Sequence, residues 1–155
     1  RFIDAYAEYF DGYNINGEDV LKKTFGDVGG YNDIVLLKDI AFNSFCEHHM
    51  APIIGKAHVA YLPSDRVVGI SKLARLVDVY AHRLQTQETM TAEITNAIDQ
   101  SLKPRGVAVI LDAEHMCMSL RGVHKHDVST ITTRFTGEFD TNENLRERFM
   151  KLTNS

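Results

Sequence analysis

The sequence has no tryptophan, only three prolines and only two cysteines among its 155 residues. Two cysteines are too few for the disulfide framework of a small secreted domain. Apolar runs are short as well, for example Ile34 to Leu37, and fall far below the roughly 20 residues that a membrane helix needs. Because there is also no signal-peptide pattern, we predict a protein of the reducing cytoplasm with no membrane partner.

An excess of charge of either sign is also missing. The chain has 17 Lys and Arg against 21 Asp and Glu, which gives a formal net charge of −4. No global basic surface is therefore available for nucleic acid, and any anion site must be a local cluster. The length and a hydrophobic content of 44 % are those of one domain with a core of its own, so we expect a single domain over residues 1–155.

The spacing of apolar residues predicts an α+β fold. Helical spacing is present over residues 1–10, 71–81 and 86–102 and in a final segment that carries Leu145, Phe149 and Leu152 on one face; a short helix is expected within 18–25. Residues 33–45, 53–62, 107–118 and 129–139 are expected to be strands, with Ala57, Val59 and Tyr61 on one face of the second. Ser71 is the expected N-cap of its helix. This order favours a sheet with the helices on one face.

Both cysteines lie beside histidines, in Cys46-Glu47-His48-His49 and in His115-Met116-Cys117. Because Cys46 and His49 are three residues apart, one turn can present a thiolate and an imidazole to the same ion, and Cys117 can approach from another strand. Two thiolates and one imidazole, with water in the fourth position, form a catalytic zinc set. The pattern therefore predicts that Cys46, His49 and Cys117 bind Zn²⁺.

The expected strand over 107–118 places His115 on the same side as Cys117, so His115 is a candidate for proton transfer beside the metal. Other interpretations of these residues stay open. The thiols could be buried and unreactive or could form one disulfide, and His48 and His49 could be a solvated pair. A structural site with His48 or His115 as fourth ligand is a further alternative.

Two other clusters suggest contacts with a nucleotide. Lys72 and Arg75 share one side of the helix that begins near Ser71, and with Arg121 they would form a local positive region suited to phosphate, although a solvated helix face is the alternative. Further along the chain, Gln87 and Glu88 offer an amide and a carboxylate. A carboxylate can accept from N1–H and the 2-amino group of guanine together, although Glu at a helix start often only complements the helix dipole.

Taken together, these segments resemble GTP cyclohydrolase I, a zinc enzyme of pteridine synthesis. The matching blocks keep the family's order over about two thirds of the chain. They are Cys46-Glu47-His48-His49, Gly55-Lys56-Ala57-His58-Val59-Ala60-Tyr61-Leu62-Pro63, Gly69-Ile70-Ser71-Lys72-Leu73-Ala74-Arg75, Arg83-Leu84-Gln85-Thr86-Gln87-Glu88, His115-Met116-Cys117-Met118 and Arg121-Gly122-Val123. Thr89-Met90, His124 and Asp4 depart from the family's usual residues, and the family's upstream helices are absent from this sequence.

The resemblance implies the tunnelling fold, an antiparallel sheet with paired helices, assembled into a homodecamer whose pockets lie between subunits. It implies GTP as substrate, release of formate, and 7,8-dihydroneopterin triphosphate as product. At matching positions it implies zinc ligands at Cys46, His49 and Cys117 and catalytic histidines at His48 and His115. Ser71, Lys72, Arg75 and Arg121 would surround the triphosphate, with Ser71 also taking part in a later rearrangement, and Gln87 and Glu88 would hold the guanine.

Three rival functions are kept beside this one. A nucleobase deaminase also uses zinc-bound water, but its H-x-E and P-C-x-x-C signature is missing from the sequence. A nitrile reductase of the same fold would use a nucleophilic cysteine without this zinc set. A purine- or pterin-binding assembly protein would hold zinc for structure alone.

Overall fold

The computed structural model describes residues 1–26 and 29–155. Its helices are α1 (Phe2–Tyr9), the 3₁₀ helix η1 (Asp11–Asn14), α2 (Gly17–Leu21), α3 (Ile70–Ala81), α4 (Gln87–Leu102), α5 (Met116–Ser119), α6 (Glu138–Thr141) and α7 (Glu143–Thr153). Its strands are β1 (Thr24–Phe25), β2 (Val35–Cys46), β3 (Pro52–Leu62), β4 (Val67–Val68), β5 (Leu84–Gln85), β6 (Gly106–His115) and β7 (Ser129–Phe135). Within the described ranges, no helix has the length and apolar character needed to cross a membrane.

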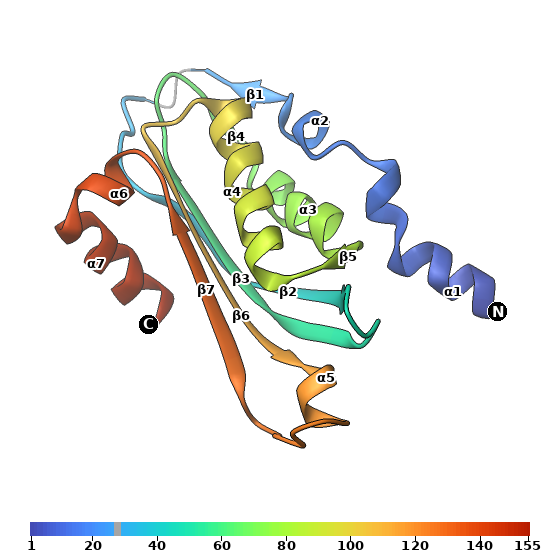
Figure 1. Ribbon diagram of the computed structural model, residues 1–155. Helices are drawn as coiled ribbons and strands as arrows, with labels where there is room; N and C mark the ends of the chain where they lie inside the picture. Colours follow the sequence, from blue (N-terminus) through green and yellow to red (C-terminus); the bar gives the residue numbers. More distant parts are fainter. Residues whose placement is uncertain (27–28) are drawn as a thin grey trace.

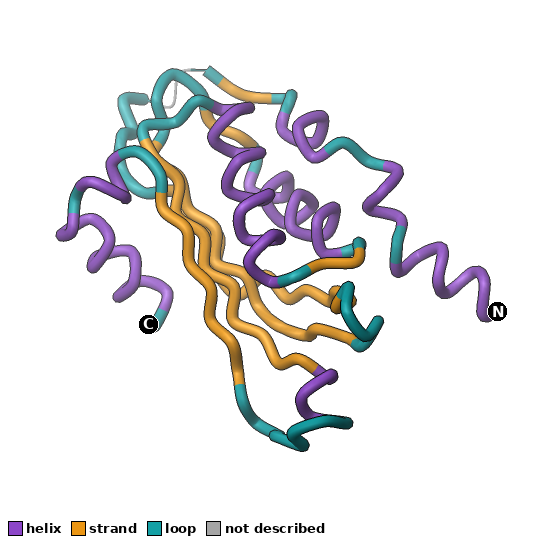
Figure 2. The backbone as a smooth tube through the Cα atoms, viewed as in Figure 1, coloured by secondary structure: helices purple, strands orange, loops and turns teal. Residues whose placement is uncertain are grey.

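The main sheet has the strand order β5-β2-β3-β6-β7 (Figures 1 and 2). Its long strands pair antiparallel, and only the short β5 runs parallel to β2, with Cys46 opposite Gln85. Strands β1 and β4 form a separate two-stranded sheet. The predicted α+β architecture is confirmed. The three two-residue strands were not predicted, because two residues are too few to show an alternation of apolar and polar side chains.

Alternate residues of the central strands fill two different hydrophobic cores. Ala57, Val59 and Tyr61 of β3 are fully buried in the larger core, together with the apolar faces of α3 and α4. Ala60 of β3 points to the opposite side, where Phe139 and Phe149 form a smaller core with it. The paired helices therefore cover one face as predicted, whereas α7 lies on the other face (Figure 1). Small side chains such as Ala60 leave room there for the two phenylalanine rings.

The ends of two predicted strands are wrong. β6 stops at His115, and the next four residues turn into α5, which is closed by a hydrogen bond from the Leu120 N–H to the Met116 oxygen (2.9 Å). The Ser119 hydroxyl also donates to Glu114, which holds this turn against the strand. β7 likewise ends at Phe135, because Gly137 adopts a positive φ of 56° at the start of α6.

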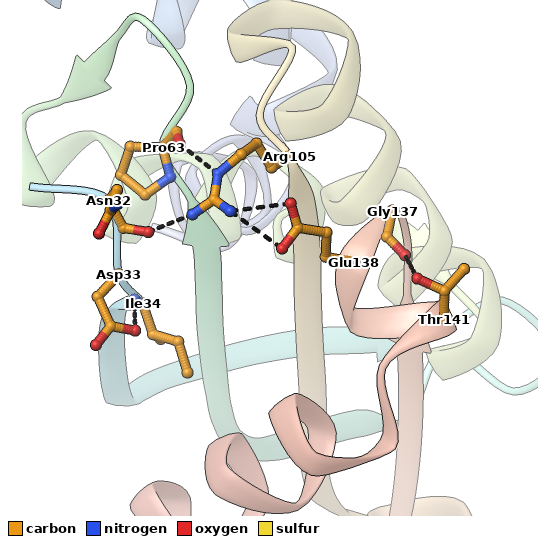
Figure 3. A network of polar contacts seen from close by, with 8 residues as sticks. All are labelled: Asn32, Asp33, Ile34, Pro63, Arg105, Gly137, Glu138 and Thr141. Atoms are coloured by element: carbon orange, nitrogen blue, oxygen red, sulfur yellow. Dashed lines mark hydrogen bonds and ion pairs between the residues drawn. The ribbon is translucent and has the colours of Figure 1, made fainter.

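Arg105, directly before β6, joins three separate segments (Figure 3). Its guanidinium donates to both carboxylate oxygens of Glu138, at 2.9 and 3.0 Å, and to the backbone oxygens of Pro63 and Asn32. A planar guanidinium suits this task because its five N–H groups point in fixed directions. The beginning of β6 is thereby held to the end of β3, to α6 and to the segment before β2.

Strand β2 contains a bulge between Leu37 and Ile40, where Asp39 has a positive φ of 58°. The backbone N–H of Asp39 donates to Nδ1 of His58 on β3, at 3.2 Å. Burial lowers the pKa of His58 below its usual value, so the neutral ring that this hydrogen bond needs is favoured.

Candidate active site

The three predicted metal ligands meet where β2, β3 and α5 come together. Cys46 is the last residue of β2, and His49 lies in the turn that follows, which the Met50 N–H closes by donating to the Cys46 oxygen (2.8 Å). Cys117 lies in α5. One ligand atom from each of these three residues lies within 4.8 Å of the others. These separations are close to those of ligands around one ion, and the two thiols and one imidazole match the preference of zinc for sulfur and nitrogen.

Both cysteines are free thiols, so the disulfide interpretation is wrong. Burial, and after it the neighbouring Cys46 thiol, raise the pKa of Cys117 above its ordinary value, while the Arg121 cation opposes this shift. A bound cation would reverse the effect by stabilising the thiolates. Among the described residues, the group of mutually close ligand atoms includes neither His48 nor His115, which does not support a four-ligand site.

His115 is the last residue of β6, opposite Ile53 of β3, and it directly precedes the helix α5 that carries the ligand Cys117. Its Nε2 is 2.7 Å from Oε1 of Gln87 at the start of α4. Burial lowers the pKa of His115, and the charge of Glu88 raises it in part. The neutral form of the ring is therefore favoured, and the nearby carboxylate of Glu88 partly stabilises the charged form.

Glu88 and Gln87 are consecutive in the first turn of α4, but their side chains differ in surroundings. Glu88 is exposed near His115, whereas Gln87 is only 1 % exposed. The amide nitrogen of Gln87 donates to the backbone oxygens of Leu111 (3.1 Å) and Thr130 (2.8 Å), and it lies 3.2 Å from Oγ1 of Thr132. The Gln87 side chain thus points into the protein.

His48 and Arg121 border the candidate metal centre. Nδ1 of His48 lies 3.9 Å from the Cys46 sulfur, and its Nε2 lies 3.7 Å from a carboxylate oxygen of Glu47. Arg121 follows α5, is exposed, and has a guanidinium nitrogen 3.4 Å from Nε2 of His49. A cation and a second imidazole therefore flank the three ligands, as expected for a site that binds an anionic substrate.

Comparison with known proteins identifies the family. The family model described as GTP cyclohydrolase I matches residues 1–154. The chain is 62 % identical to GTP cyclohydrolase 1 of Allorhizobium ampelinum over 98 % of this chain and 76 % of the relative. It is 61 % identical to that of Sinorhizobium fredii (98 % and 74 %) and 60 % identical to that of Brucella anthropi (99 % and 72 %). The chain belongs to the GTP cyclohydrolase I family.

The enzymes of the GTP cyclohydrolase I family open a ring of GTP in the first step of pterin and folate biosynthesis, so this chain is a hydrolase of that kind. Family membership also removes the deaminase and nitrile reductase alternatives. Among solved structures, an archaeosine synthase QueF-Like in the apo form matches with a TM-score of 0.56 and 19 % identity, over 69 % of this chain and 96 % of that chain. This match confirms the predicted tunnelling fold.

Three residues that the resemblance to GTP cyclohydrolase I places around the triphosphate lie away from the metal ligands of the same chain. Ser71 and Lys72 are in the first turn of α3, directly after β4, while the other end of α3 leads to β5 beside Cys46 (Figure 1). With twelve residues, α3 is about 18 Å long. Arg75 lies one turn further along α3, is exposed and borders a cavity with Asp78 and His82.

Ser71 is not the N-cap of α3. Gly69 takes that place with an extended backbone, and no side chain caps the helix start. The Lys72 N–H instead donates to the Gly69 oxygen at 2.8 Å. The Ser71 hydroxyl is exposed and remains available to a ligand.

Sequence analysis missed the two threonines, Thr91 and Thr132, that contact Gln87. The Thr91 hydroxyl donates to the Gln87 backbone oxygen and lies 2.7 Å from the Thr132 hydroxyl of β7. A threonine four residues after a glutamine in a helix, together with a threonine-rich strand, was the available signal. It was interpreted only as strand propensity.

Proposed function

We propose that this chain hydrolyses the guanine imidazole ring of GTP at C8, releases formate and, after rearrangement and closure, yields 7,8-dihydroneopterin triphosphate. The observation that carries the proposal is the convergence of Cys46, His49 and Cys117, from two distant parts of the chain, beside His115 and Glu88. Residues 1–155 act as one catalytic domain in this proposal, and the reaction takes place in the cytoplasm.

Zinc is the metal that this donor set fits best, because two thiolates and an imidazole are soft and borderline ligands. Three protein ligands leave one coordination position for solvent or substrate. When bound there, zinc supplies a water of lowered pKa, which becomes a nucleophile near neutral pH. Cys46 is buried at the end of β2, and His49 lies in the hydrogen-bonded turn that follows, so both ligands are held at this end of the strand.

The two histidines move protons around the reacting ring. His115 protonates N7 of the guanine, which makes C8 electrophilic, and His48 relays a second proton. The position of His115 at the end of β6 supports this role, since it lies two residues before the ligand Cys117 and is not a member of the ligand group. The lowered pKa of His115 supports it as well, because an imidazolium with a lower pKa is a stronger acid.

The substrate is held at both of its ends. Glu88 accepts from N1–H and the 2-amino group of guanine, and Arg121 beside His49 binds phosphate oxygens. Ser71, Lys72 and Arg75 bind the rest of the triphosphate. Because α3 separates these three residues from the metal ligands of their own chain, they serve the pocket of a neighbouring copy. The homodecamer that the resemblance implies provides such neighbours, and Ser71 then assists the later rearrangement.

The proposal is tested by incubating the zinc-loaded protein with GTP and measuring formate, together with the fluorescent pterin that forms after oxidation. Zinc content is measured on the same sample by elemental analysis. We expect formate and pterin in equal amounts from the native protein. We also expect both to be lost with zinc from Cys117→Ser, while GTP still binds through Glu88 and the basic residues. If Cys117→Ser opened the ring at the native rate, the assigned metal role would be wrong.

A further inference from the structure

We infer that Gln87 is a positioning residue that fixes the imidazole of His115, and that its side chain is not a guanine contact. The inference rests on the proposed role of His115 in proton transfer. The family resemblance implies that Gln87 and Glu88 both hold the guanine, whereas this inference leaves the guanine contact to Glu88. The decisive observation is the buried hydrogen-bond network around the Gln87 amide.

The direction of each hydrogen bond in this network follows from chemistry. The backbone oxygens of Leu111 and Thr130 can only accept, so the Gln87 nitrogen must face them and donate. The other end of the amide, Oε1, can only accept, and it lies 2.7 Å from Nε2 of His115. Nε2 of His115 therefore carries a hydrogen.

The consequence for His115 is that Nδ1 is the ring nitrogen left for the substrate. Among the residues that the structure describes, none forms a hydrogen bond with Nδ1. Gln87 Oε1 accepts from Nε2–H whether Nδ1 is protonated or not, so the ring keeps one orientation while Nδ1 gains and loses a proton. A second-sphere partner of this kind fixes both tautomer and direction, as in other acid–base sites.

The burial of Gln87 also speaks against a guanine contact. Its side chain is 1 % exposed and both amide hydrogens are directed at acceptors on β6 and β7. To reach a ligand it would have to leave two backbone oxygens without their donor, which is unfavourable in a buried place. Glu88, in contrast, is exposed and needs no such rearrangement.

The decisive variant is Gln87→Met, which keeps the length of the side chain and removes its donor and acceptor. With zinc bound, we expect kcat for formate release to fall by roughly 10- to 100-fold, because the acid is no longer aligned. In metal-free protein, where no turnover takes place, we expect the Kd for GTP to stay within about twofold of the native value. Glu88→Gln is the comparison, and its Kd should rise by at least roughly tenfold, since it removes a charge-assisted contact.

Thr95→Val is the matched control for stability. Thr95 is fully buried one turn beyond Thr91, and among the described residues its hydroxyl donates to the Thr91 backbone oxygen alone. This variant loses a buried hydroxyl of α4 without touching Gln87, so its kcat should equal the native value. A kcat as low as that of Gln87→Met would show that any disturbance of α4 suffices, and would overturn the inference.

A second measurement needs no variant at Gln87 and remains valid if Gln87→Met fails to fold. In metal-free protein labelled with ¹⁵N-histidine, the ring nitrogens of His115, identified by their loss in His115→Ala, should report the Nε2–H tautomer at neutral pH. The Nδ1–H tautomer, or an average of both, would overturn the inference. So would a Kd for GTP that rises in Gln87→Met as it does in Glu88→Gln. If native, zinc-loaded protein released no formate, the proposed function would fail, whereas the tautomer and the Kd values would still decide the role of Gln87.

Discussion

Lys72 and Cys46 lie at opposite ends of α3, Lys72 in its first turn and Cys46 beside the strand that follows its last. One is the expected phosphate ligand and the other the expected metal ligand. About 18 Å of helix lies between these ends. We therefore expect a complete site to take its Lys72 from another copy of the chain, as proposed above.

This arrangement predicts complementation between two inactive variants. Lys72→Ala and Cys117→Ser should each release little formate alone. When their subunits are mixed by unfolding and refolding together, about a quarter of the sites should be intact, because each site draws the two residues from different copies. Recovery of about a quarter of the native activity is the expected result. A mixture as inactive as its parents would place both residues in the pocket of a single chain.

Replacing His115 with alanine should separate metal binding from turnover. Because the mutually close ligand atoms come from Cys46, His49 and Cys117, the variant should keep its zinc. Its kcat should fall by roughly 100-fold or more, as expected when a general acid is removed. Elemental analysis and the formate assay on one preparation give both answers. Loss of zinc from this variant would instead make His115 a ligand.

The bulge of β2 should make stability depend on pH through His58. Burial is the main cause that lowers the pKa of His58, the charges of Asp39 and Asp112 oppose it, and Lys38 and Lys56 support it. Because the unfolded chain then binds a proton more readily than the folded chain, stability should fall as the pH drops through about 6.5 and towards the folded pKa.

His58→Asn is the matched control, since its Oδ1 can accept from the Asp39 N–H and does not titrate. The thermal midpoint of the native protein should decline more steeply than that of His58→Asn between pH 7.5 and 5.5. Parallel curves would refute the effect.

Arg105→Ala should destabilise the fold without changing the chemistry of the site. The change leaves the backbone oxygens of Pro63 and Asn32 without their donor and removes the pair with Glu138, for an expected cost of about 1–3 kcal/mol. Chemical denaturation at a fixed protein concentration measures this cost. The exposed pair of Arg148 with Asp33 provides the comparison, and Arg148→Ala should cost less. Equal effects of the two substitutions would contradict the role given to Arg105.

Sequence patterns were informative where one segment carries its own signal. The run of β3 buries Ala57, Val59 and Tyr61 as its alternation predicts, and α4 begins after Thr86, whose hydroxyl accepts from the Thr89 N–H at 3.1 Å. The grouping of Cys46, His49 and Cys117 was also predicted, because few residue types bind zinc and both cysteines lie beside histidines. The strand and the helix start can be recognised within a few neighbouring residues, and the metal group can be recognised because each cysteine has a histidine close to it in the sequence.

Features that depend on distant partners were missed. The alternation in 107–118 continues through Met116 and Cys117, yet contacts such as that of Ser119 with Glu114 turn these residues into α5. A glutamine in the first turn of a helix, such as Gln87, is expected to be exposed to solvent. Its burial is decided by carbonyl groups of β6 and β7, more than twenty residues further along the chain. No local pattern encodes such a partner.

The anchorage of Gln87 on the carbonyls of two adjoining strands has a consequence for heat inactivation. His115, the proposed proton-transfer group, is held through Gln87 to the sheet and, among the residues that the structure describes, forms no hydrogen bond with the exposed segment that carries Arg121. Warming should therefore weaken phosphate binding first, so that the apparent KM for GTP rises while kcat stays unchanged. Catalytic power should disappear only when the β-structure melts.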